Sequence, residues 1–352
     1  MTRDDFPSTC YHNLRDKTFT EANDMQSGTC GKNLTWTFDG DTLTIVGTGK
    51  MESYGWNNEA LRSTVPWYDN RKSIRKVIIS DGVETIGTYA FKDCTNLTDV
   101  TIADSVKTIG GQAFGWGDMK TLTIPDGVIS IGRGSFLFCC DLTEIRLPET
   151  LTVIGGGTFF GCYNLRSVTI PDGVKLIANG TFHGCEKLTA VKIPDTVTAI
   201  GGRAFYACKS LAEIKIPDSV TTLGKELFSG CRNLTKATLP EGITTIGDSF
   251  FKDCRSLKDM LIPNSVTTIE WYAFRRCTNL TSVTIPDGVK IILKGAFKDC
   301  IGLTEIKIPR SVMTLGKEIF KGCTALRKIY YPAGSGFEKI LSAGNDAKLI
   351  SY

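Results

Sequence analysis

The stretch that decides the fold runs from Phe159 to Ile170 and reads FFGCYNLRSVTI. It is followed by PDGVKLIANGT and then by Phe182, where the same order of residue types starts again. The pattern returns every 23 residues, apart from one interval of 22 residues between Phe114 and Phe136. The anchoring phenylalanines are Phe91, Phe114, Phe136, Phe159, Phe182, Phe205, Phe228, Phe251, Phe274, Phe297 and Phe320. A fixed period of this length is typical of a solenoid, because single turns cannot bury their apolar side alone.

Each repeat contains the signals of two short strands. Aliphatic residues alternate with polar ones at Leu165, Val168 and Ile170, as in a strand with one buried face. A Pro-Asp-Gly turn ends that strand at 171–173, and the aliphatic residues at 174 and 177 return the chain to the core. We therefore expect a β-rich solenoid of about eleven 23-residue turns, with neighbouring turns ~4.8 Å apart.

The two ends of the array differ from its repeats. Residues 1–27 are polar and lack periodicity, which predicts an arm. Leu34, Trp36 and Phe38 alternate with polar residues before an Asp-Gly turn, a strong hairpin signal. Because an open solenoid end exposes apolar residues, we interpret 28–73 as a β-rich N-terminal cap and 74–332 as the array. Residues 333–352 are expected to form a C-terminal cap of one short helix and one strand.

A small residue recurs four positions before most of the anchoring phenylalanines. Glycine is the usual choice, which predicts a bend with positive φ, although Ala178, Glu270 and Leu293 stand there in three turns. The glycines are Gly87, Gly110, Gly132, Gly155, Gly201, Gly224, Gly247 and Gly316.

Composition excludes several classes of protein. The 41 Lys and Arg against 37 Asp and Glu give a net charge of +4, too mild to predict nucleic-acid binding. No apolar run approaches the ~18–20 residues of a membrane span. Residues 1–27 contain no apolar segment of the kind found in signal peptides. The chain as given is therefore either cytosolic or has lost an export signal.

Ten cysteines form a column of their own. They are Cys94 and then Cys139 to Cys323 at 23-residue spacing. Stacked turns would place their Cβ atoms ~4.8 Å apart, wider than the ~3.8 Å that a disulfide prefers. A straight column also cannot surround one zinc ion tetrahedrally, so we predict buried free thiols. Cys10, Cys30 and Cys140 lie outside the column, and a Cys10–Cys30 bridge is left open.

The residues do not point to catalysis. The histidines are His12 and His183, and neither has a nucleophile or a ligand partner at a readable spacing. We predict no catalytic residue, no cofactor and no metal ligand. An acidic row follows the first strand of nine turns, and we interpret it as turn capping, with cation binding as the alternative. Its members are Asp81, Asp104, Asp126, Glu149, Asp172, Asp195, Asp218, Glu241 and Asp287.

The loop after the buried phenylalanine carries the candidate binding residues. Aromatic and basic side chains gather there, in contrast to the threonines and mixed charges on the outer face of the strands. Tryptophan, tyrosine and arginine are the types enriched at binding hot spots. The alternative is that some of the rings fold back over the core. The aromatic part holds Trp116, Leu137, Phe138, Phe160, His183 and Tyr206, and the basic part holds Lys252, Arg255, Arg275, Arg276, Lys298 and Lys321. The binding candidates are Trp116, Phe138, Phe160, Tyr163, Tyr206, Arg275 and Arg276.

The repeat and the entry to the array resemble the BspA-like leucine-rich repeat family. The resemblance rests on CTNLTSVTIPDGV at 277–289, on GTCGKNLTWTFDGDTLTIVGTGKM at 28–51 and on PWYDNRKSIRKVIISDGV at 66–83, and it covers about 28–352. It implies a leucine-rich repeat solenoid that is not an enzyme, and an extracellular or cell-surface location. It also implies adhesion to host or extracellular proteins, with host extracellular matrix as a candidate partner. The alternatives are a carbohydrate-binding surface module and a purely structural spacer.

Overall fold

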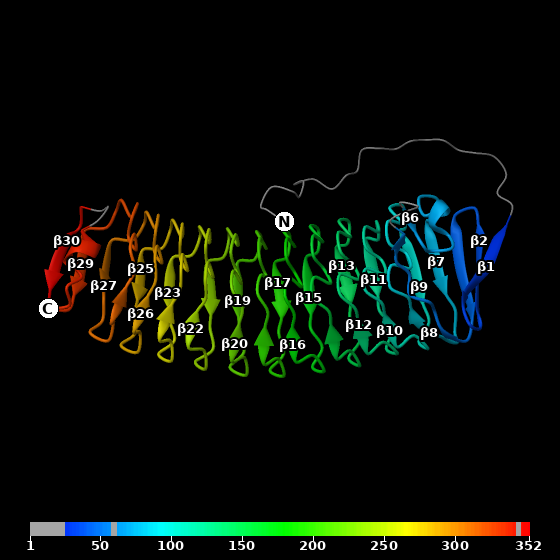
Figure 1. Ribbon diagram of the computed structural model, residues 1–352, viewed down its shortest axis with the longest axis horizontal. Helices are drawn as coiled ribbons and strands as arrows, with labels where there is room; N and C mark the ends of the chain where they lie inside the picture. Colours follow the sequence, from blue (N-terminus) through cyan, green and yellow to red (C-terminus); the bar gives the residue numbers. More distant parts are fainter. Residues whose placement is uncertain (1–24, 58–61, 343–345) are drawn as a thin grey trace.

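The computed structural model describes residues 25–57, 62–342 and 346–352. The predicted N-terminal arm lies outside these residues, apart from its last three positions. Figure 1 shows a long rod of stacked turns, with the N-terminal strands at one end and the C-terminal strand at the other.

Each turn contributes one strand to each of two faces of the rod. The strands of the first face are β7 (Lys76–Ile79), β9 (Asp99–Ile102), β11 (Thr121–Thr123), β13 (Glu144–Arg146), β15 (Ser167–Thr169), β17 (Ala190–Lys192), β19 (Glu213–Lys215), β21 (Lys236–Thr238), β23 (Asp259–Leu261), β25 (Ser282–Thr284), β27 (Glu305–Lys307) and β29 (Lys328–Tyr331). Those of the second face are β8 (Val83–Ile86), β10 (Thr108–Ile109), β12 (Ser130–Ile131), β14 (Val153–Ile154), β16 (Leu176–Ile177), β18 (Ala199–Ile200), β20 (Thr222–Leu223), β22 (Thr245–Ile246), β24 (Thr268–Ile269), β26 (Ile291–Ile292) and β28 (Thr314–Leu315).

Within each sheet, the strands of neighbouring turns of the array pair in parallel and in a constant register. Val168 pairs with Val191 on the first face, and Ile177 pairs with Ile200 on the second. Eleven complete turns and a twelfth strand, β29, follow one another within the described residues. The predicted solenoid and its period of about 23 residues are therefore confirmed.

The N-terminal end is closed by an antiparallel meander. β1 (Gln26–Gly31), β2 (Leu34–Asp39) and β3 (Thr42–Gly47) lie side by side, and the β2–β3 hairpin turns at Gly40 with φ +61°. β3 then pairs in parallel with β7, so the meander continues directly into the first face of the array. Three short strands and a 3-10 helix complete this end: β4 (Gly49–Lys50), β5 (Trp56–Asn57), β6 (Arg62–Ser63) and η1 (Tyr68–Asn70).

Aromatic side chains cover the first turn. Trp67 is 1% exposed, and its ring stacks on Phe91 with 5.6 Å between the ring centroids. Trp36 meets Trp67 edge to face at 5.8 Å. At the other end, α1 (Glu338–Leu341) buries Leu341, and β30 (Lys348–Ser351) pairs in parallel with β29. No helix within the described ranges has the length and apolar character that crossing a bilayer requires.

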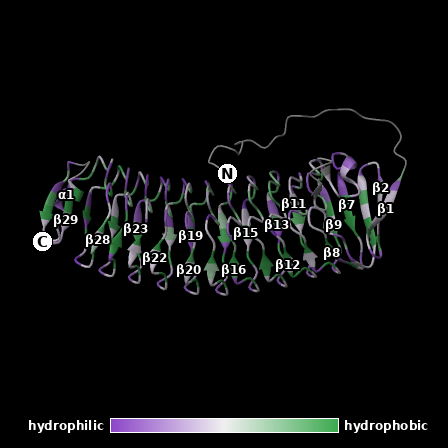
Figure 2. Ribbon diagram, viewed as in Figure 1, coloured by the Kyte–Doolittle hydropathy of each residue, from purple (hydrophilic) through white to green (hydrophobic). Residues whose placement is uncertain are grey.

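The core is a stack of phenylalanine rings. All the anchoring phenylalanines are 0–2% exposed, and consecutive rings lie 5.1–5.9 Å apart with interplanar angles of 1–22°. Exposed and buried residues alternate along strands such as β13, β15 and β19, as expected for faces with one buried side, and Figure 2 shows hydrophobic and hydrophilic segments mixed along the whole rod. Each turn thus buries its apolar side against the turns before and after it.

The cysteine column is reduced, and its thiols form hydrogen bonds. Each thiol from Cys139 to Cys323 donates to the carbonyl of the phenylalanine in the preceding turn, with Sγ to O distances of 3.0–3.2 Å. The cysteines therefore act as buried donors as well as small apolar residues, which the sequence does not reveal. Cys30 is also free and fully buried, so the Cys10–Cys30 bridge is wrong. Burial raises the pKa of the Cys30 thiol to about 12.

The predicted role of the recurrent glycines is wrong. None of those eight glycines has a positive φ. Seven of them are small because a neighbouring backbone passes close by, and a Cβ on Gly110 or Gly155 would lie 2.5 Å from a backbone nitrogen of the preceding turn; Gly247 has no such close neighbour. The left-handed residues instead lie two positions before and two positions after the phenylalanine, as at Tyr89 (φ 61°) and Asp93 (φ 63°) around Phe91.

The acidic row does not cap its turns. In the described turns a backbone bond closes the loop, as from Val174 N–H to the Pro171 carbonyl at 3.1 Å. Hydroxyl groups add bonds to the preceding turn, as from Ser219 Oγ to the Val197 carbonyl at 2.7 Å. The carboxylate of Asp126 instead pairs with Arg146 at 3.4 Å. Among the described residues, no group of three or more His, Cys, Asp or Glu side chains is placed to hold a metal ion.

Candidate binding edge

The loop after each buried phenylalanine forms one edge of the rod. Its backbone is held by bonds to the next turn, as from Trp116 N–H to the Leu137 carbonyl and from Phe138 N–H to the Phe160 carbonyl, both at 2.8 Å. The residue two positions after the phenylalanine has a positive φ in every turn of the array. These residues are Asp93, Trp116, Phe138, Gly161, Gly184, Ala207, Gly230, Asp253, Arg276, Asp299 and Gly322. The edge is therefore a regular, hydrogen-bonded surface, not a set of independent loops.

Five rings from consecutive turns form a continuous column on this edge, which we call the aromatic ladder: Trp116, Phe138, Phe160, His183 and Tyr206. The centroids of the first two rings lie 5.6 Å apart, and the next pair meets edge to face at 5.4 Å. The last two steps are stacked at 4.2 Å and 4.5 Å. All five side chains are half-buried, and the two stacked steps cover ring faces of Phe160, His183 and Tyr206.

The ladder changes position between its second and third rings. Trp116 and Phe138 lie two residues after their phenylalanines, whereas Phe160 lies one residue after Phe159. Gly161 permits this change, because a Cβ there would fall within the ring of Phe138, and because its φ is +71°. The backbone of Trp116 and Phe138 is left-handed as well, at φ 66° and 55°. A left-handed conformation costs a residue with a side chain about 1–2 kcal/mol relative to the ordinary helical region.

Two further side chains border the ladder. The ring of Tyr163 lies 6.4 Å from that of Phe138, and burial raises the pKa of its phenol. At the other end, Lys92 Nζ lies 5.0 Å from the ring of Trp116, within the range of a cation–π contact. The aromatic surface thus begins beside a cation and widens at Tyr163.

His183 is neutral at neutral pH. Burial between the neighbouring rings lowers its pKa to about 4, with the Arg203 guanidinium acting in the same direction and Glu226 against it. Arg203 and Glu226 themselves form an ion pair of 2.6 Å. A neutral imidazole suits this place, because the rings of Phe160 and Tyr206 lie on either side of it.

The basic part of the edge is compensated by carboxylates. Arg275 Nε lies 3.6 Å from Asp299, and Arg276 lies 3.9 Å from both Asp253 and Asp299. Arg255 lies 3.7 Å from Asp253. The guanidinium of Arg275 also lies 5.5 Å from the ring of Tyr272. The steering of acidic partners that a row of cations would supply is therefore weakened by the paired carboxylates.

The structure brings together only some of the predicted binding residues. Trp116, Phe138, Phe160 and Tyr206 share one column, and Tyr163 borders it. Arg275 and Arg276 lie on the same edge but three turns beyond Tyr206, in a network of ion pairs. His183, which the candidate set omits, is the link between Phe160 and Tyr206. Its signal in the sequence is its place directly after Phe182.

Comparison with known proteins decides the family. The profile of the BspA type leucine-rich repeat region matches residues 67–189, 175–301 and 268–342, in six copies. The chain belongs to the BspA-type leucine-rich repeat family. No curated protein matches the sequence.

Solved structures share the fold of this BspA-type chain. A leucine-rich repeat protein of Eubacterium ventriosum is 25% identical, with 85% of this chain and 95% of that chain covered and a TM-score of 0.56. A leucine-rich repeat protein of Bacteroides ovatus is 24% identical, with coverages of 91% and 99% and a TM-score of 0.65. The pneumococcal vaccine antigen PcpA is 16% identical, with coverages of 95% and 100% and a TM-score of 0.55. The last two likenesses bear on the fold alone.

Proposed function

We propose that this chain is a non-catalytic module that binds a protein partner along the aromatic ladder. The observation that carries this proposal is the ladder itself, five rings in consecutive turns on a hydrogen-bonded edge. Aromatic side chains bury large areas with few rotors to freeze, so they gain more on binding than flexible polar residues do. Trp116 and Phe138 also occupy backbone positions where glycine would be less strained, which favours a role other than stability.

The packing of the rings favours a protein over a carbohydrate. A sugar ring stacks on an open aromatic face, but the faces of Phe160 and His183 are covered by neighbouring rings at 4.2 Å and 4.5 Å. The exposed rims form a narrow apolar strip instead, which suits the side chains of a protein. A pure spacer would need no such strip.

Membership of the BspA-type family supports recognition of proteins outside the cell. We therefore propose an extracellular or cell-surface location, adhesion as the role, and host extracellular matrix proteins as the first ligands to test. The outer side of the first-face strands is a weaker candidate, because its exposed residues are mainly threonines and charged side chains that gain little on desolvation, although Leu261 on β23 is also exposed.

The test compares two triple variants in binding to immobilised host matrix proteins. Trp116, Phe160 and Tyr206 changed to Ala should lose at least ~2 kcal/mol of binding free energy, about 30-fold in affinity. Thr169, Lys192 and Lys215 changed to Ala, on β15, β17 and β19, should change the affinity little. The opposite ranking, with folding intact by circular dichroism, would move the site to the strands. Binding to a glycan array alone would favour the carbohydrate alternative, and binding to neither would favour the spacer.

A further inference from the structure

The first face of the rod is open between β9 and β11. The hydrogen-bonded sheet that starts at β1 ends at β9, and a separate sheet starts at β11. On the second face the corresponding strands β8, β10 and β12 remain paired. At this level the second face stays paired, whereas on the first face a bond from the Asp118 N–H to the Leu97 carbonyl at 3.0 Å joins the two turns just ahead of β9 and β11, and the strands themselves are unpaired.

The separation coincides with the single short repeat. The chain from Phe114 to Met119 is one residue shorter than the corresponding stretch from Phe91 to Leu97. The connection that delivers β11 to the sheet is therefore shorter than in any neighbouring turn, and we attribute the open seam to it. Strand pairing on the first face is also interrupted at three other places, but there the strands keep the 23-residue spacing and stay in contact. These places are β17 and β19, β21 and β23, and β25 and β27.

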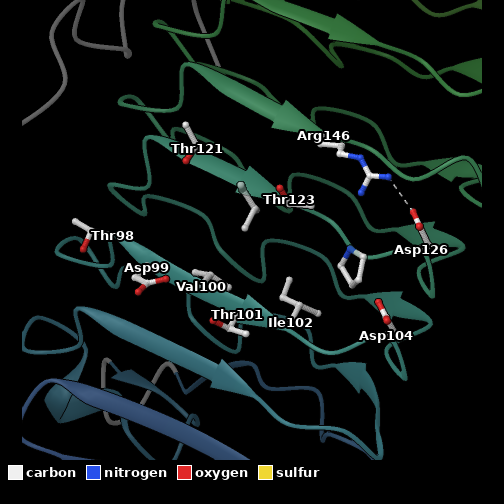
Figure 3. Close-up of a pocket in the computed structure, with 12 residues that line it drawn as sticks. Thr98, Asp99, Val100, Thr101, Ile102, Asp104, Thr121, Thr123, Asp126 and Arg146 are labelled. Carbon is white, nitrogen blue, oxygen red and sulfur yellow. Dashed lines mark hydrogen bonds and ion pairs between the residues drawn. The ribbon is translucent and has the colours of Figure 1, made fainter.

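The seam forms a groove of about 490 Å³ that is lined by both strands. Figure 3 shows Val100 and Ile102 on one side of it and Thr121 and Thr123 on the other. In a parallel sheet, the backbone N–H and C=O groups of alternate residues point toward opposite neighbouring strands. By this alternation, the backbone groups of these four residues point into the groove. In the next turn the N–H of Ile124, at the position equivalent to Ile102, donates to the Arg146 carbonyl at 3.0 Å. Within the described residues the Ile102 N–H makes no corresponding bond to β11, and β9 and β11 belong to separate sheets.

The charges in the groove are unbalanced. Its lining holds Asp99, Asp104 and Asp126 against Arg146. Asp99 lies 3.6 Å from Lys76, and Asp126 lies 3.4 Å from Arg146, as the dashed line in Figure 3 shows. Within the described ranges Asp104 has no ion-pair partner, and it lies just beyond the C-terminal end of β9. A cation bound at that end would meet an uncompensated carboxylate.

From these observations we infer that the groove binds an extended peptide segment of a partner protein, inserted between β9 and β11, with a Lys or Arg beside Asp104. Two facing strand edges offer main-chain donors and acceptors on both sides of such a segment, which is strand addition with two edges in place of one. Three extended residues span about 10 Å, the length of β11. The volume lies within the ~300–1,000 Å³ of ordinary ligand sites. This site goes beyond the proposed function and does not depend on the aromatic ladder.

The first measurement is amide hydrogen exchange on the free and peptide-bound full chain. In the free protein the Ile102 N–H should exchange at least 10-fold faster than the Ile124 N–H. The probe is the pentapeptide acetyl-Thr-Val-Thr-Val-Lys-amide, which should slow exchange at Val100 and Ile102. Equal protection of Ile102 and Ile124 in the free protein would overturn the open seam. An unchanged exchange rate with saturating peptide would overturn the binding site.

The second measurement separates backbone pairing from charge. The same peptide with alternate amides N-methylated should bind at least 10-fold more weakly by fluorescence anisotropy. Asp104→Asn should weaken binding of the parent peptide about 3–10-fold, whereas Asp172→Asn, at the same position of a turn outside the groove, should not. Equal affinity of the two peptides, or equal effects of the two substitutions, would contradict strand insertion beside Asp104.

The third measurement restores the missing residue. Insertion of one Asn between Asp118 and Met119 should let β9 and β11 pair, protect Ile102 and abolish peptide binding. If this variant does not fold, the N-methylated peptide still decides the question. The ladder variant with Trp116, Phe160 and Tyr206 changed to Ala should bind the peptide normally. Loss of peptide binding in that variant would show that the peptide occupies the edge and would overturn the groove.

Discussion

Acid should destabilise the protein through His183 before most carboxylates titrate. The imidazole lies between the rings of Phe160 and Tyr206, and burial lowers its pKa from 6.5 to about 4. The folded state therefore binds fewer protons than the unfolded state between those two pH values. Stability from the neutral ring is fully present above about pH 6.5 and is lost as the pH falls toward 4.

The size of the effect follows from the shift. A difference of one pKa unit corresponds to 1.36 kcal/mol, so the full loss is roughly 3 kcal/mol, of which about 2 kcal/mol is reached at pH 5. The assay is urea unfolding at pH 7.5, 6, 5, 4.5, 3.7 and 3.3, with the midpoint and slope followed by circular dichroism. The control is His183→Phe, which preserves a ring between Phe160 and Tyr206 but cannot titrate.

The comparison isolates the histidine from other acid-sensitive groups. Wild type should lose about 2 kcal/mol more than His183→Phe between pH 7.5 and pH 5, and the two should run parallel below pH 4. Asp93, whose pKa burial raises, is common to both proteins and cancels in the difference. Identical pH dependence of the two proteins would refute the buried, neutral imidazole and with it the stacked part of the ladder.

Two further predictions concern the core. Phe205 is fully buried between Phe182 and Phe228 at 5.5 Å and 5.7 Å, so Phe205→Ala should cost about 3–5 kcal/mol in urea unfolding. The matched control is Lys192→Ala, an exposed position that should cost under about 0.5 kcal/mol; equal urea midpoints for the two variants would contradict the register. Cys30 and the ten column cysteines are free, so alkylation in denaturant without reductant should label at least eleven thiols. Because burial raises the pKa of Cys139 and Cys231 to about 12, the native protein near pH 8 should react far more slowly, and eight or fewer labelled thiols would show that the column is cross-linked.

The elements that local chemistry specifies could be predicted from the sequence. The period of 23 residues, the Phe column, the cysteine column and the β2–β3 hairpin at Gly40 all depend on residue types at fixed spacings. A solenoid makes such inference unusually direct, because each residue meets its own equivalent in the next turn. The aromatic row was also visible, since its members follow the buried phenylalanines one by one.

Contacts between turns decided the rest. Trp116 and Phe138 have a left-handed backbone, which their own conformational preferences do not favour. Hydrogen bonds between turns hold the backbone in this conformation. The pairing of Arg275 with Asp299 depends on which side chains the stacked turns bring close together. The change of position in the aromatic ladder at Gly161 depends on the space that the Phe138 ring fills. The 22-residue interval is evident in the sequence, but only the tertiary structure shows that β9 and β11 are unpaired at that level while β8, β10 and β12 stay paired on the other face, because strand pairing depends on how the turns stack and not on local residue types.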